Sequence, residues 1–326
     1  MLKVGVIGLG QWGLVHLETL MASSQYDVVG VFDTDPIKMN HAVKQFQVNS
    51  FDSLDDLIAA CDVLNIVTPT ENHFDIASKA IREQKHVFIE KPVTTSLEEA
   101  KRLINLSHEA KVKVQVGHNE RFNPAYAQMK GLIENPLFIE SHRLNEFTPD
   151  CMKISVIHDL MIHDIDIILN IVNSTVKKVS ATGVAVVNGT PDIANARIEF
   201  DNGAVASLTA SRIATKNMRK TRIFQRNAYL TVDFLEQQAE HLKVDDEHGY
   251  QPFTMTLDLK NNVKKQLSFQ RMDVKPSNAI QDELESFADA INNNTSPVVS
   301  LNDGHDAMLI ANEILNKLKL TNTLVE

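Results

Sequence analysis

Short, continuously apolar runs alternate with helical patterns over the first 118 residues. Five runs rich in β-branched residues are typical of parallel strands covered on both faces: they are Val4–Ile7, Val28–Phe32, Val63–Val67, Val87–Ile89 and Val112–Val116. Helical patterns lie between them, and Ser96 with Glu99 predicts a capping box at the start of one helix. This βαβ series predicts a right-handed, doubly wound parallel sheet in a domain of residues 1–118.

The pattern changes near residue 120. A strongly apolar helix is predicted over roughly Val156–Val172, followed by strands near residues 178–187, 193–200, 204–211, 220–225, 228–233, 240–245 and 253–258. Turn signals separate these strands, namely Asn188-Gly189, Asp201-Asn202-Gly203 and His248-Gly249. Because short turns join successive strands, we expect antiparallel pairing in a second α/β domain of residues 119–326, closed by helices near 277–291 and 304–318.

Composition and charge narrow the class of protein. Apolar residues make up 43% and charged residues 23%, as in soluble globular proteins, and no apolar run approaches the ~18 residues of a membrane-spanning helix. The N-terminal segment has no leader pattern, so we expect a cytoplasmic protein without a secretion signal. The two cysteines, Cys61 and Cys151, are too few for a disulfide framework or a zinc ribbon. A formal net charge of −10 argues against a general nucleic-acid binder.

A glycine-rich loop follows the first predicted strand. The sequence Gly8-Leu9-Gly10-Gln11-Trp12-Gly13 is a G-x-G-x-x-G motif that opens a helix. The first glycine of such a motif permits a tight turn, the second lets the backbone approach a pyrophosphate at the helix N-terminus, and the third allows close helix–strand packing. We therefore expect a dinucleotide to contact Gly8, Gly10, Gln11, Trp12 and Gly13.

An acidic residue ends the second predicted strand. Asp33 lies twenty residues after Gly13, where a carboxylate can accept hydrogen bonds from both ribose hydroxyls of an adenosine. The same carboxylate would repel a 2′-phosphate, and no arginine follows within the next few residues. The pattern therefore favours NAD over NADP, and it disfavours the alternative of a plain glycine-rich turn beside a surface aspartate.

Polar residues also follow the third predicted strand, at the edge where doubly wound sheets bind ligands. In the segment Thr68-Pro69-Thr70-Glu71-Asn72-His73, Thr70 is expected to cap the next helix and His73 to lie in its first turn. We expect Thr68, Pro69, Thr70 and His73 to contact the cofactor. The alternative is a capped turn that binds no ligand.

The triplet Glu90-Lys91-Pro92 follows the fourth predicted strand at the same edge. A lysine there would face the nicotinamide, where it could orient a substrate hydroxyl or help to remove its proton if its pKa were lowered. We expect Glu90 and Lys91 to contact the cofactor and Lys91 to contact the substrate as well. The alternative is a solvated lysine followed by a proline that ends the strand.

The predicted helix over 156–172 carries carboxylates and imidazoles among apolar residues. Asp159 and His163 are i, i+4, and Asp166 continues the same stripe. A carboxylate beside an imidazole in an apolar setting suits proton transfer, because it fixes the tautomer and raises the basicity of the histidine. A structural His–Asp pair is one alternative. A metal site that also uses His158 and Asp164 is another, although a spacing of five residues is poor for shared ligation by two histidines.

Basic residues cluster between Ser211 and Asn227 without an intervening acid: they are Arg212, Lys216, Arg219, Lys220, Arg222 and Arg226. In an acidic chain this stretch could bind a diphosphate or a carboxylate of the substrate. The alternative is a solvated sheet edge or an oligomer contact.

Taken together, the glycine motif at 8–13, Asp33, Glu90-Lys91-Pro92 and Asp159-x-x-x-His163 resemble the glucose–fructose oxidoreductase / inositol dehydrogenase / MocA family over essentially the whole chain. The resemblance implies an N-terminal Rossmann domain and a C-terminal α/β domain with an open, mostly antiparallel sheet. It implies redox chemistry with NAD or NADP at a secondary alcohol of a sugar or polyol, with Lys91, Asp159 and His163 as the catalytic group. A cis peptide bond at Lys91-Pro92 and a homodimer or homotetramer formed through the C-terminal sheet are also implied.

A finer resemblance involves two further segments. Gly117-His118-Asn119-Glu120-Arg121-Phe122-Asn123-Pro124-Ala125 and the run from Ser211-Arg212 to Arg219-Lys220 are similar to segments of relatives that act on UDP-N-acetyl sugars at C3. This implies Arg121, Asn123, Arg212 and Arg219 as substrate-binding residues, the basic stretch serving the diphosphate. The loop Met152-Lys153-Ile154-Ser155-Val156 departs from the family, in which glycines often precede the catalytic helix.

We therefore predict an NAD-dependent oxidoreductase that transfers a hydride between nicotinamide and a secondary hydroxyl, at C3 of a UDP-N-acetylhexosamine or its uronate if the finer resemblance holds. His163, oriented by Asp159, is expected to act as the base and Lys91 to hydrogen-bond the same oxygen, although the residues leave open which of the two takes the proton. One alternative is an inositol, polyol or simple-sugar dehydrogenase, which would not need the basic stretch. The other is a non-catalytic NAD-binding sensor, which would not need the three catalytic residues together.

Overall fold

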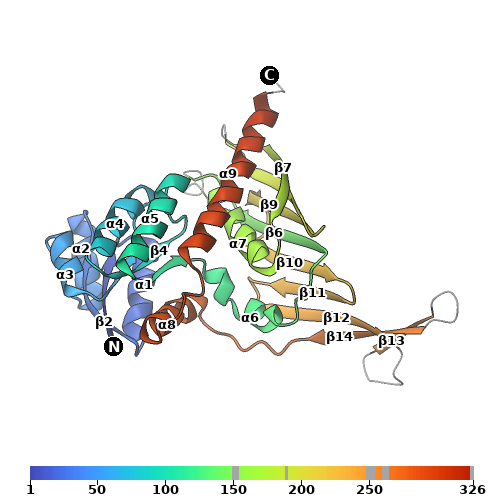
Figure 1. The fold of residues 1–326 in the computed structure, drawn as a ribbon, viewed down its shortest axis with the longest axis horizontal. Coiled ribbons are helices and arrows are strands. Elements are labelled where there is room, and N and C mark those ends of the chain that lie inside the picture. The colour runs from blue at the N-terminus through green and yellow to red at the C-terminus, as the bar shows by residue number, and fades with distance from the viewer. Residues whose placement is uncertain (149–153, 188–189, 247–253, 259–263, 324–326) are drawn as a thin grey trace. The chain divides into compact units, whose positions relative to one another are not determined.

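The computed structural model describes residues 1–148, 154–187, 190–246, 254–258 and 264–323. The chain divides into two compact units (Figure 1). The first unit comprises Met1–Phe122 and Asn278–Leu309, and the second comprises Asn123–Ser277 and Ile310–Glu326. Each unit is described below by itself.

The first unit is built on a five-stranded parallel sheet of order β2-β1-β3-β4-β5. Its strands are β1 (Leu2–Ile7), β2 (Tyr26–Phe32), β3 (Val63–Ile66), β4 (His86–Glu90) and β5 (Val114–Gly117). Neighbouring strands run parallel throughout. The apolar runs of the central strands are fully buried, Val4, Ile66 and Phe88 among them, because both faces of the sheet are covered. The predicted parallel sheet is confirmed.

Helices connect these strands, as the alternating pattern predicts. They are α1 (Gln11–Ala22), α2 (Pro36–Phe46), α3 (Leu54–Ala60), α4 (His73–Arg82) and α5 (Leu97–Ala110), with short 3₁₀ turns η1 (Thr70–Asn72) and η2 (Asn119–Phe122). The capping box at α5 is confirmed: the Glu99 N–H donates to Ser96 Oγ, and the Ser96 N–H donates to the Glu99 carboxylate, each at 3.2 Å. These bonds satisfy two N–H groups that the helix itself leaves without a partner.

A segment from late in the chain completes this unit. Helix α8 (Ala279–Asn292) buries Leu284 and Phe287 in the same core as Phe88, with the rings of Phe88 and Phe287 6.2 Å apart. The Tyr26 hydroxyl donates to the Leu284 carbonyl oxygen at 2.6 Å. The predicted division at residue 118 does not anticipate this return, because an apolar helix face does not reveal which sheet it will cover.

The second unit is built on a nine-stranded sheet of order β13-β14-β12-β11-β10-β6-β9-β8-β7. Its strands are β6 (Phe138–Glu146), β7 (Val176–Val184), β8 (Ile193–Phe200), β9 (Val205–Ala214), β10 (Met218–Gln225), β11 (Ala228–Asp233), β12 (Gln238–Asp246), β13 (Thr254–Asp258) and β14 (Lys264–Arg271). All neighbouring pairs are antiparallel except β6 and β9, which are parallel. The expected mostly antiparallel sheet is confirmed.

Two strands of this sheet, β6 and β14, are absent from the sequence prediction. In β6 the buried positions are Ile139, Ser141 and Arg143, so two of the three inward side chains are polar. An alternation of apolar and polar residues is therefore missing, although the alternation of buried and exposed positions is present. Polar residues dominate the sequence of β14 in the same way.

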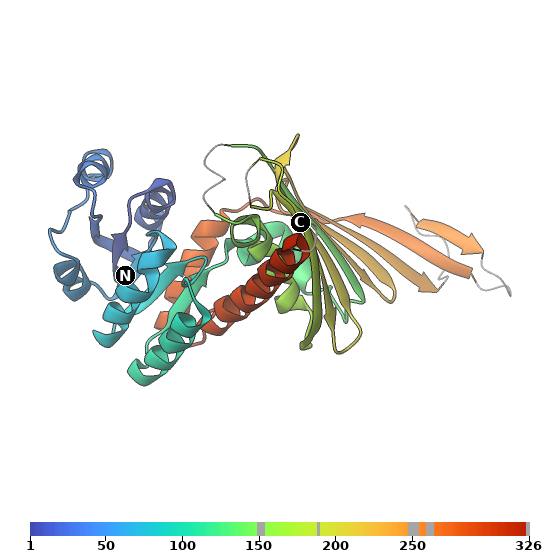
Figure 2. The ribbon, with the colours of Figure 1, turned by 90° about the horizontal axis from the view of Figure 1, so that it is seen from above.

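Helices cover one face of this sheet (Figure 2). They are α6 (Pro124–Lys130), α7 (Ile162–Ile171) and the part of α9 (Leu301–Thr323) that belongs to this unit. The long apolar helix predicted over 156–172 begins with a π-helical turn, η4 (Ile157–Met161), before α7. The sequence pattern did not predict this turn, whose i→i+5 hydrogen bonds differ from those of the α-helix that follows.

Other sequence expectations have mixed outcomes. The turn at Asp201-Asn202-Gly203 is present, with Gly203 at a φ of +87°. Cys61 is a buried free thiol, and burial raises its pKa to about 12. Cys151 and the predicted turns Asn188-Gly189 and His248-Gly249 lie outside the described residues. In the part of the chain that the structure describes, no helix has the length and apolarity needed to cross a membrane.

Candidate active site

The glycine loop after β1 has the geometry of a dinucleotide cradle. Gly8 adopts a φ of +91°, and a Cβ there would lie 2.6 Å from the Val67 carbonyl oxygen. A Cβ on Gly13 would lie 1.8 Å from the Gly8 carbonyl oxygen, so α1 packs directly against the loop. A Cβ on Gly10 would meet no atom within 4 Å. The backbone at Gly10 is therefore open to a ligand, as the approach of a pyrophosphate requires.

The start of α1 and Asp33 extend this cradle. No side chain caps the N-terminus of α1, which leaves its first N–H groups available to an anion, and Gln11 and Trp12 are exposed in its first turn. The two Asp33 carboxylate oxygens accept hydrogen bonds from the Leu9 N–H at 2.7 Å and the Asp35 N–H at 2.8 Å. Each carboxylate oxygen has a further lone pair that can accept a ribose hydroxyl.

The segment after β3 is organised by His73. Its Nε2 lies 2.8 Å from the Thr68 carbonyl oxygen, and its Nδ1 lies 3.0 Å from the Pro92 carbonyl oxygen. The His73 ring thereby links the ends of β3 and β4. Burial lowers the pKa of His73, although both carbonyl groups and Glu90 oppose this shift.

The expectation that Thr70 caps the helix after β3 is wrong. The 3₁₀ turn η1 intervenes, and the His73 N–H at the start of α4 donates to the Thr70 carbonyl oxygen rather than to its hydroxyl. His73 does lie in the first turn of α4. Thr68, Pro69 and Thr70 thus lie at the carboxyl edge of the sheet, where cofactor contacts are expected.

A buried histidine holds the end of β4. His16 of α1 is 1% exposed, and its Nε2 lies 3.1 Å from Glu90 Oε1. The other Glu90 oxygen accepts the Lys91 backbone N–H at 3.0 Å. A Cβ on Gly117 would lie 2.6 Å from Glu90 Oε1, so a glycine leaves the room that this carboxylate needs. The position of Lys91 is therefore built on contacts from α1, β4 and β5.

The charge of Glu90 follows from the same contacts. Burial raises the pKa of Glu90, but the hydrogen bond and charge of His16, together with Lys91, outweigh burial and lower it.

The peptide bond Lys91-Pro92 is cis, as the family resemblance implies. His16 is a residue that the sequence analysis missed, and its signal is a lone imidazole among the apolar residues of α1, three positions after Gly13.

Two predicted substrate ligands, Arg121 of the first unit and Asn123 of the second, are close together in the sequence. Arg121 is 7% exposed, and its Nη2 lies 3.1 Å from Asp303 Oδ1. Burial raises the pKa of Asp303, but Arg121 and Ser300 outweigh burial and lower it. Asn123 caps α6 through the Ala125 N–H at 3.1 Å, and its amide donates to a backbone carbonyl oxygen at 2.9 Å. Both side chains therefore have structural contacts within their own units.

Asp159 and His163 belong to the second unit, whereas Lys91 belongs to the first. Asp159 lies in the π-helical turn, His163 is the second residue of α7, and both side chains are partly buried. The residues that lie between them in the chain, Leu160, Met161 and Ile162, are buried. Asp166 is also buried, at 1% exposure. The catalytic roles of Asp159 and His163 stay a prediction.

The residues of the alternative metal site have other partners. Asp164 accepts two hydrogen bonds from the Arg143 guanidinium, at 2.8 and 3.1 Å, and one from the Ser141 hydroxyl at 2.9 Å. His158 Nε2 lies 3.1 Å from Asn312 Oδ1. No group of three or more His, Cys, Asp or Glu side chains is placed to bind a metal ion within the described ranges.

Strand alternation divides the basic stretch between the two faces of the sheet. Arg219 pairs in register with Arg143, on the face that the helices cover. Lys220 and Arg222 point to the opposite face, where Lys220 lies 3.1 Å from Asp233 and Arg222 lies 3.1 Å from Glu140. One bound anion therefore cannot contact the whole stretch, contrary to the simplest interpretation of the sequence.

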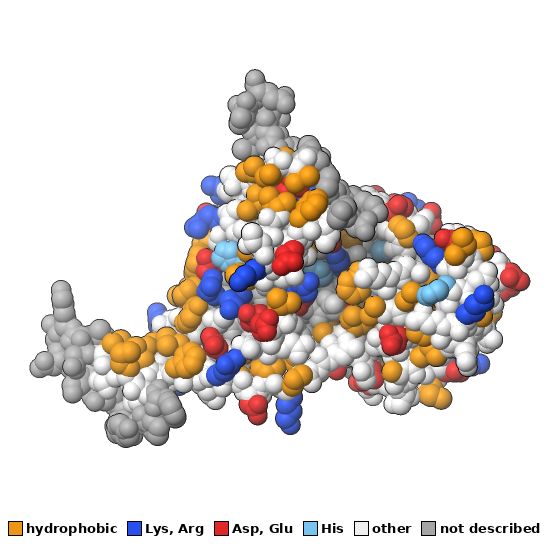
Figure 3. All heavy atoms as spheres, turned by 180° about the vertical axis from the view of Figure 1, so that it is seen from behind, with side chains coloured by type: hydrophobic (Ala, Val, Ile, Leu, Met, Phe, Trp, Pro, Cys, Tyr) orange, Lys and Arg blue, Asp and Glu red, His pale blue; other side chains and the backbone are white. Residues whose placement is uncertain are grey.

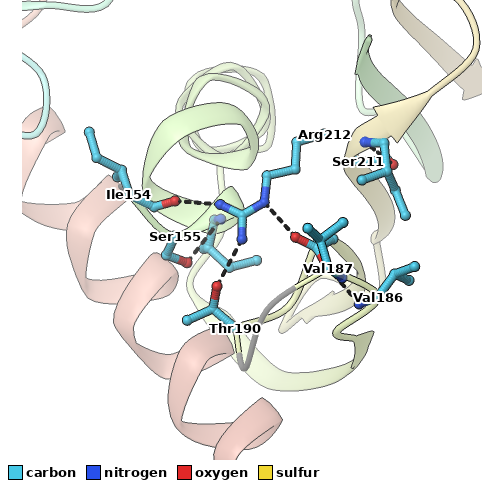
Figure 4. Close-up of polar contacts among 10 residues, drawn as sticks. Ile154, Ser155, Val186, Val187, Thr190, Ser211 and Arg212 are labelled. Atoms are coloured by element: carbon cyan, nitrogen blue, oxygen red, sulfur yellow. Dashed lines mark hydrogen bonds and ion pairs between the residues drawn. The ribbon is translucent and has the colours of Figure 1, made fainter. Parts of the chain in front are cut away.

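Arg212, in contrast, is buried and hydrogen-bonded within the second unit. Its side chain is 2% exposed, and its Nε donates to Asp192 Oδ1 at 2.8 Å. Its other nitrogens donate to the Ile154 carbonyl oxygen and the Thr190 hydroxyl, each at 2.8 Å (Figure 4). These contacts join the guanidinium to three groups of the protein itself, and the role of Arg212 in binding substrate stays a prediction.

Comparison with known proteins assigns the chain to a family. Residues 2–118 match the family model described as an oxidoreductase family with an NAD-binding Rossmann fold, and residues 134–231 match the GFO/IDH/MocA C-terminal domain. The chain belongs to the GFO/IDH/MocA oxidoreductase family. It is therefore an oxidoreductase with an NAD-binding Rossmann domain, which agrees with the cradle formed by Gly10 and Asp33.

Relatives in this family act on sugars and inositols. The chain is 39% identical over 236 residues to a UDP-N-acetylglucosamine 3-dehydrogenase of Acidithiobacillus ferrooxidans, covering 72% of this chain and 74% of that protein. A solved structure of the A. ferrooxidans enzyme has a TM-score of 0.89 and covers 98% of both chains at 30% identity. The NAD-dependent scyllo-inositol 2-dehydrogenase of Bacillus subtilis is 32% identical over 235 residues, or 64% of this chain and 67% of that protein.

A more distant structure shares the fold. Scyllo-inositol dehydrogenase from Lactobacillus casei, solved with NAD(H) and scyllo-inositol, has a TM-score of 0.79 at 20% identity, with 98% of both chains covered. The two family models and the A. ferrooxidans relative confirm the sequence-based recognition of the GFO/IDH/MocA family and the expectation of a dehydrogenase with an NAD-binding domain.

Proposed function

We propose that this chain is an NAD-dependent dehydrogenase that oxidises the C3 hydroxyl of a UDP-N-acetylhexosamine or its uronate. The observation that carries the proposal is the 39% identity to a UDP-N-acetylglucosamine 3-dehydrogenase over 72% of the chain. The cradle at Gly10 and the placement of Lys91 at the end of β4 support the redox half of the proposal.

The choice of NAD over NADP rests on Asp33. Its carboxylate lies beside the glycine loop and accepts the Leu9 N–H at 2.7 Å, which fixes it as an acceptor for ribose hydroxyls. A 2′-phosphate would meet this negative charge, and the residues that follow, Thr34 to Ile37, contain no arginine to offset it. NADP is therefore expected to bind more weakly than NAD.

The chemistry assigns a role to each of three side chains. NAD, when bound, supplies the hydride acceptor at nicotinamide C4. We assign His163 as the base that takes the proton of the substrate hydroxyl, and Asp159 as the carboxylate that sets its orientation and raises its basicity. Lys91 donates a hydrogen bond to the same oxygen and stabilises the negative charge that develops on it.

The nucleotide part of the substrate requires a cationic contact. Arg219 lies on the helix-covered face of the sheet, the same face as the helix that carries His163. We assign Arg219 to the diphosphate, because a guanidinium matches the geometry of phosphate oxygens. Arg121 and Asn123 complete the substrate set by resemblance.

The open face of the nine-stranded sheet suits a second copy of this chain. Cross-strand neighbours form an apolar row on that face, namely Val205, Phe138, Phe224, Tyr229, Leu242 and Phe269. Beside this row, acidic and basic cross-strand neighbours alternate: they are Glu140, Arg222, Glu240 and Arg271. Thr231 lies between Arg222 and Glu240. Hydrophobic side chains are also exposed over the β13–β14 end of the sheet (Figure 3). Alternating charges are self-complementary about a two-fold axis, so we propose a homo-oligomer formed through this face.

The mass in solution tests the oligomer. Light scattering is expected to report a multiple of the 36.4 kDa chain. Phe224→Glu is expected to yield a folded monomer, because it places a charge in the centre of the apolar row. A monomeric wild-type protein would refute the proposed interface.

Absorbance at 340 nm tests the reaction. Purified protein and NAD are offered UDP-N-acetylglucosamine, its uronate, myo-inositol and glucose in parallel. NADH is expected only with a UDP-sugar. Signal only with inositol or glucose would keep the reaction class and refute the nucleotide-sugar substrate. NAD binding without any turnover on this panel would favour the sensor.

Substitution of the base tests the mechanism. His163→Ala is expected to lower kcat by about 10²-fold or more, and to leave the Kd for NAD unchanged. Asp159→Asn is expected to lower kcat less, because the base itself remains. Unchanged turnover in His163→Ala would remove His163 from the mechanism.

A further inference from the structure

Two buried Arg–Asp ion pairs hold the segment that carries Asp159 and His163. The pair Arg143–Asp164 joins strand β6 to helix α7. The pair Arg212–Asp192 lies at the other end of that segment, where the chain enters the π-helical turn. The proposed mechanism gives none of these four residues a role in the reaction itself, so each pair needs a different explanation.

The second pair connects to Asp159 through the backbone. The Arg212 guanidinium donates to the Ile154 carbonyl oxygen at 2.8 Å. The next residue, Ser155, then begins the helix: its hydroxyl accepts the Ile157 N–H at 3.2 Å and its carbonyl oxygen accepts the Asp159 N–H at 2.9 Å. Figure 4 shows Arg212 reaching across from β9 to this point. One buried guanidinium therefore fixes the point at which the helix starts.

Asp192 holds the Arg212 guanidinium in place, and it is itself held by the backbone. It is fully buried, and its Oδ2 accepts the backbone N–H groups of Val186 and Val187, each at 2.7 Å. Burial raises the pKa of Asp192, but these N–H groups and Arg212 outweigh burial and lower it, so the carboxylate is charged. The guanidinium is thus held between a fixed anion and the Ile154 carbonyl oxygen.

The energetics indicate a role beyond stability. Removing two charges from water is costly, and a buried ion pair is often no more stabilising than apolar residues of the same volume. Such a pair can instead specify one geometry. A single geometry has to be fixed at the start of this helix, because a π-helical turn is an irregular element that backbone hydrogen bonding alone does not favour.

We propose that Arg212 is a positioning residue that fixes the start of the helix bearing Asp159 and His163, with Asp192 as its anchor. The inference rests on the proposed function, since the two helix residues have their catalytic roles only there. It reassigns Arg212 from the anion-binding stretch to the support of the base.

Hydrogen exchange and kinetics of Arg212→Met in the full chain test the proposal. Peptides covering residues 155–163 are expected to exchange about tenfold faster than in the wild type, whereas peptides from β1 and α1 keep their rates. With a UDP-sugar substrate, kcat is expected to fall about tenfold to a hundredfold, because small misplacements of a catalytic group are costly. KM and the Kd for NAD are expected to stay within about twofold, since Arg212 contacts neither ligand.

Two further variants serve as controls. Arg82→Met removes an exposed arginine charge from helix α4, outside the basic stretch, and it is expected to change neither exchange over 155–163 nor kcat. Arg212→Lys keeps the charge but lacks the planar fork, so its effects are expected to be intermediate. The lysine variant also provides the comparison if Arg212→Met does not fold.

The outcomes separate this proposal from the proposed function. Unchanged exchange over 155–163 would overturn the positioning role. Faster exchange with unchanged kcat would overturn it too, if His163→Ala lowers kcat, because Arg212 would then support only the fold. If His163→Ala leaves kcat unchanged, the proposed function fails, and with it the catalytic purpose of Arg212. The exchange result would still show whether Arg212 holds the helix start.

Discussion

The two units of the chain use their charged side chains in opposite ways. In the first unit, Asp33, Glu90 and Lys91 lie partly buried at the carboxyl edge of a parallel sheet. The Asp33 and Glu90 carboxylates accept hydrogen bonds from backbone N–H groups, and Glu90 also pairs with His16. In the second unit, Arg143 and Arg212 are almost fully buried, and each is bonded to a buried aspartate. The charges of the first unit thus lie at the edge where doubly wound sheets bind ligands, whereas these buried charges of the second unit are paired within the fold.

The difference follows from the geometry of the two sheets. Parallel strands all end at the same edge, so residues that follow several strands meet there and can share a ligand. In an antiparallel sheet successive residues alternate between faces, and neighbouring basic residues such as Arg219 and Lys220 point in opposite directions. A run of like charges along such a strand therefore does not form one binding surface.

Breaking a buried pair gives the largest expected effect. Asp164→Asn leaves the Arg143 charge buried without its counter-ion, and it is expected to cost about 3 to 5 kcal/mol of unfolding free energy. Glu199→Gln is the matched control: it breaks the exposed pair with Arg197 and is expected to cost less than about 1 kcal/mol. Urea denaturation measures both. Equal losses would contradict the structural role of buried charge in the second unit.

Two substitutions in the glycine loop of the first unit distinguish an effect on protein stability from an effect on NAD affinity. Gly13→Ala drives a methyl group into the Gly8 carbonyl oxygen, and it is expected to cost about 3 kcal/mol of stability. Gly10→Ala places its methyl group in open space, so stability is expected to stay unchanged. NAD affinity is expected to fall about tenfold or more, because the methyl group occupies the space of the pyrophosphate. Full NAD affinity in a folded Gly10→Ala variant would argue against this cradle.

Substitution of Asp33 tests whether its carboxylate, at the carboxyl edge of the parallel sheet, binds NAD. Asp33→Ala is expected to weaken NAD about tenfold, since hydrogen bonds to a charged group contribute about 1.5 kcal/mol or more, whereas NADP affinity changes less or rises. Isothermal titration with both dinucleotides measures the difference. Equal losses for the two would refute the contact between Asp33 and the ribose.

His73 gives the smallest effect, seen in the pH dependence of stability. Because burial lowers its pKa in the folded state, the unfolded chain takes up the proton first as the pH falls below about 6.5. The folded state is therefore expected to lose stability from that pH downward, by at most about 1.4 kcal/mol per pH unit. In His73→Gln this contribution is expected to disappear, so its unfolding free energy varies less between pH 7 and pH 5. Identical pH profiles would show that the folded state does not disfavour the proton on His73.

The fold of the NAD-binding half of this protein could be predicted from its sequence. A glycine motif, an acid at a strand end and a capping box are local patterns, and their geometry depends on residues close in the chain or on the shared edge of a parallel sheet. The family, the parallel sheet and the mostly antiparallel second sheet were all predictable for this reason.

Only the tertiary structure determined which polar residues are buried. Strand β6 was missed because its inward side chains include Ser141 and Arg143, whose partner Asp164 lies on a helix. His16 and Asp192 were missed because their partners, Glu90 and Arg212, lie far along the chain. A charged residue has the same sequence signature whether water or a distant counter-ion compensates its charge, so long-range pairing decides its role.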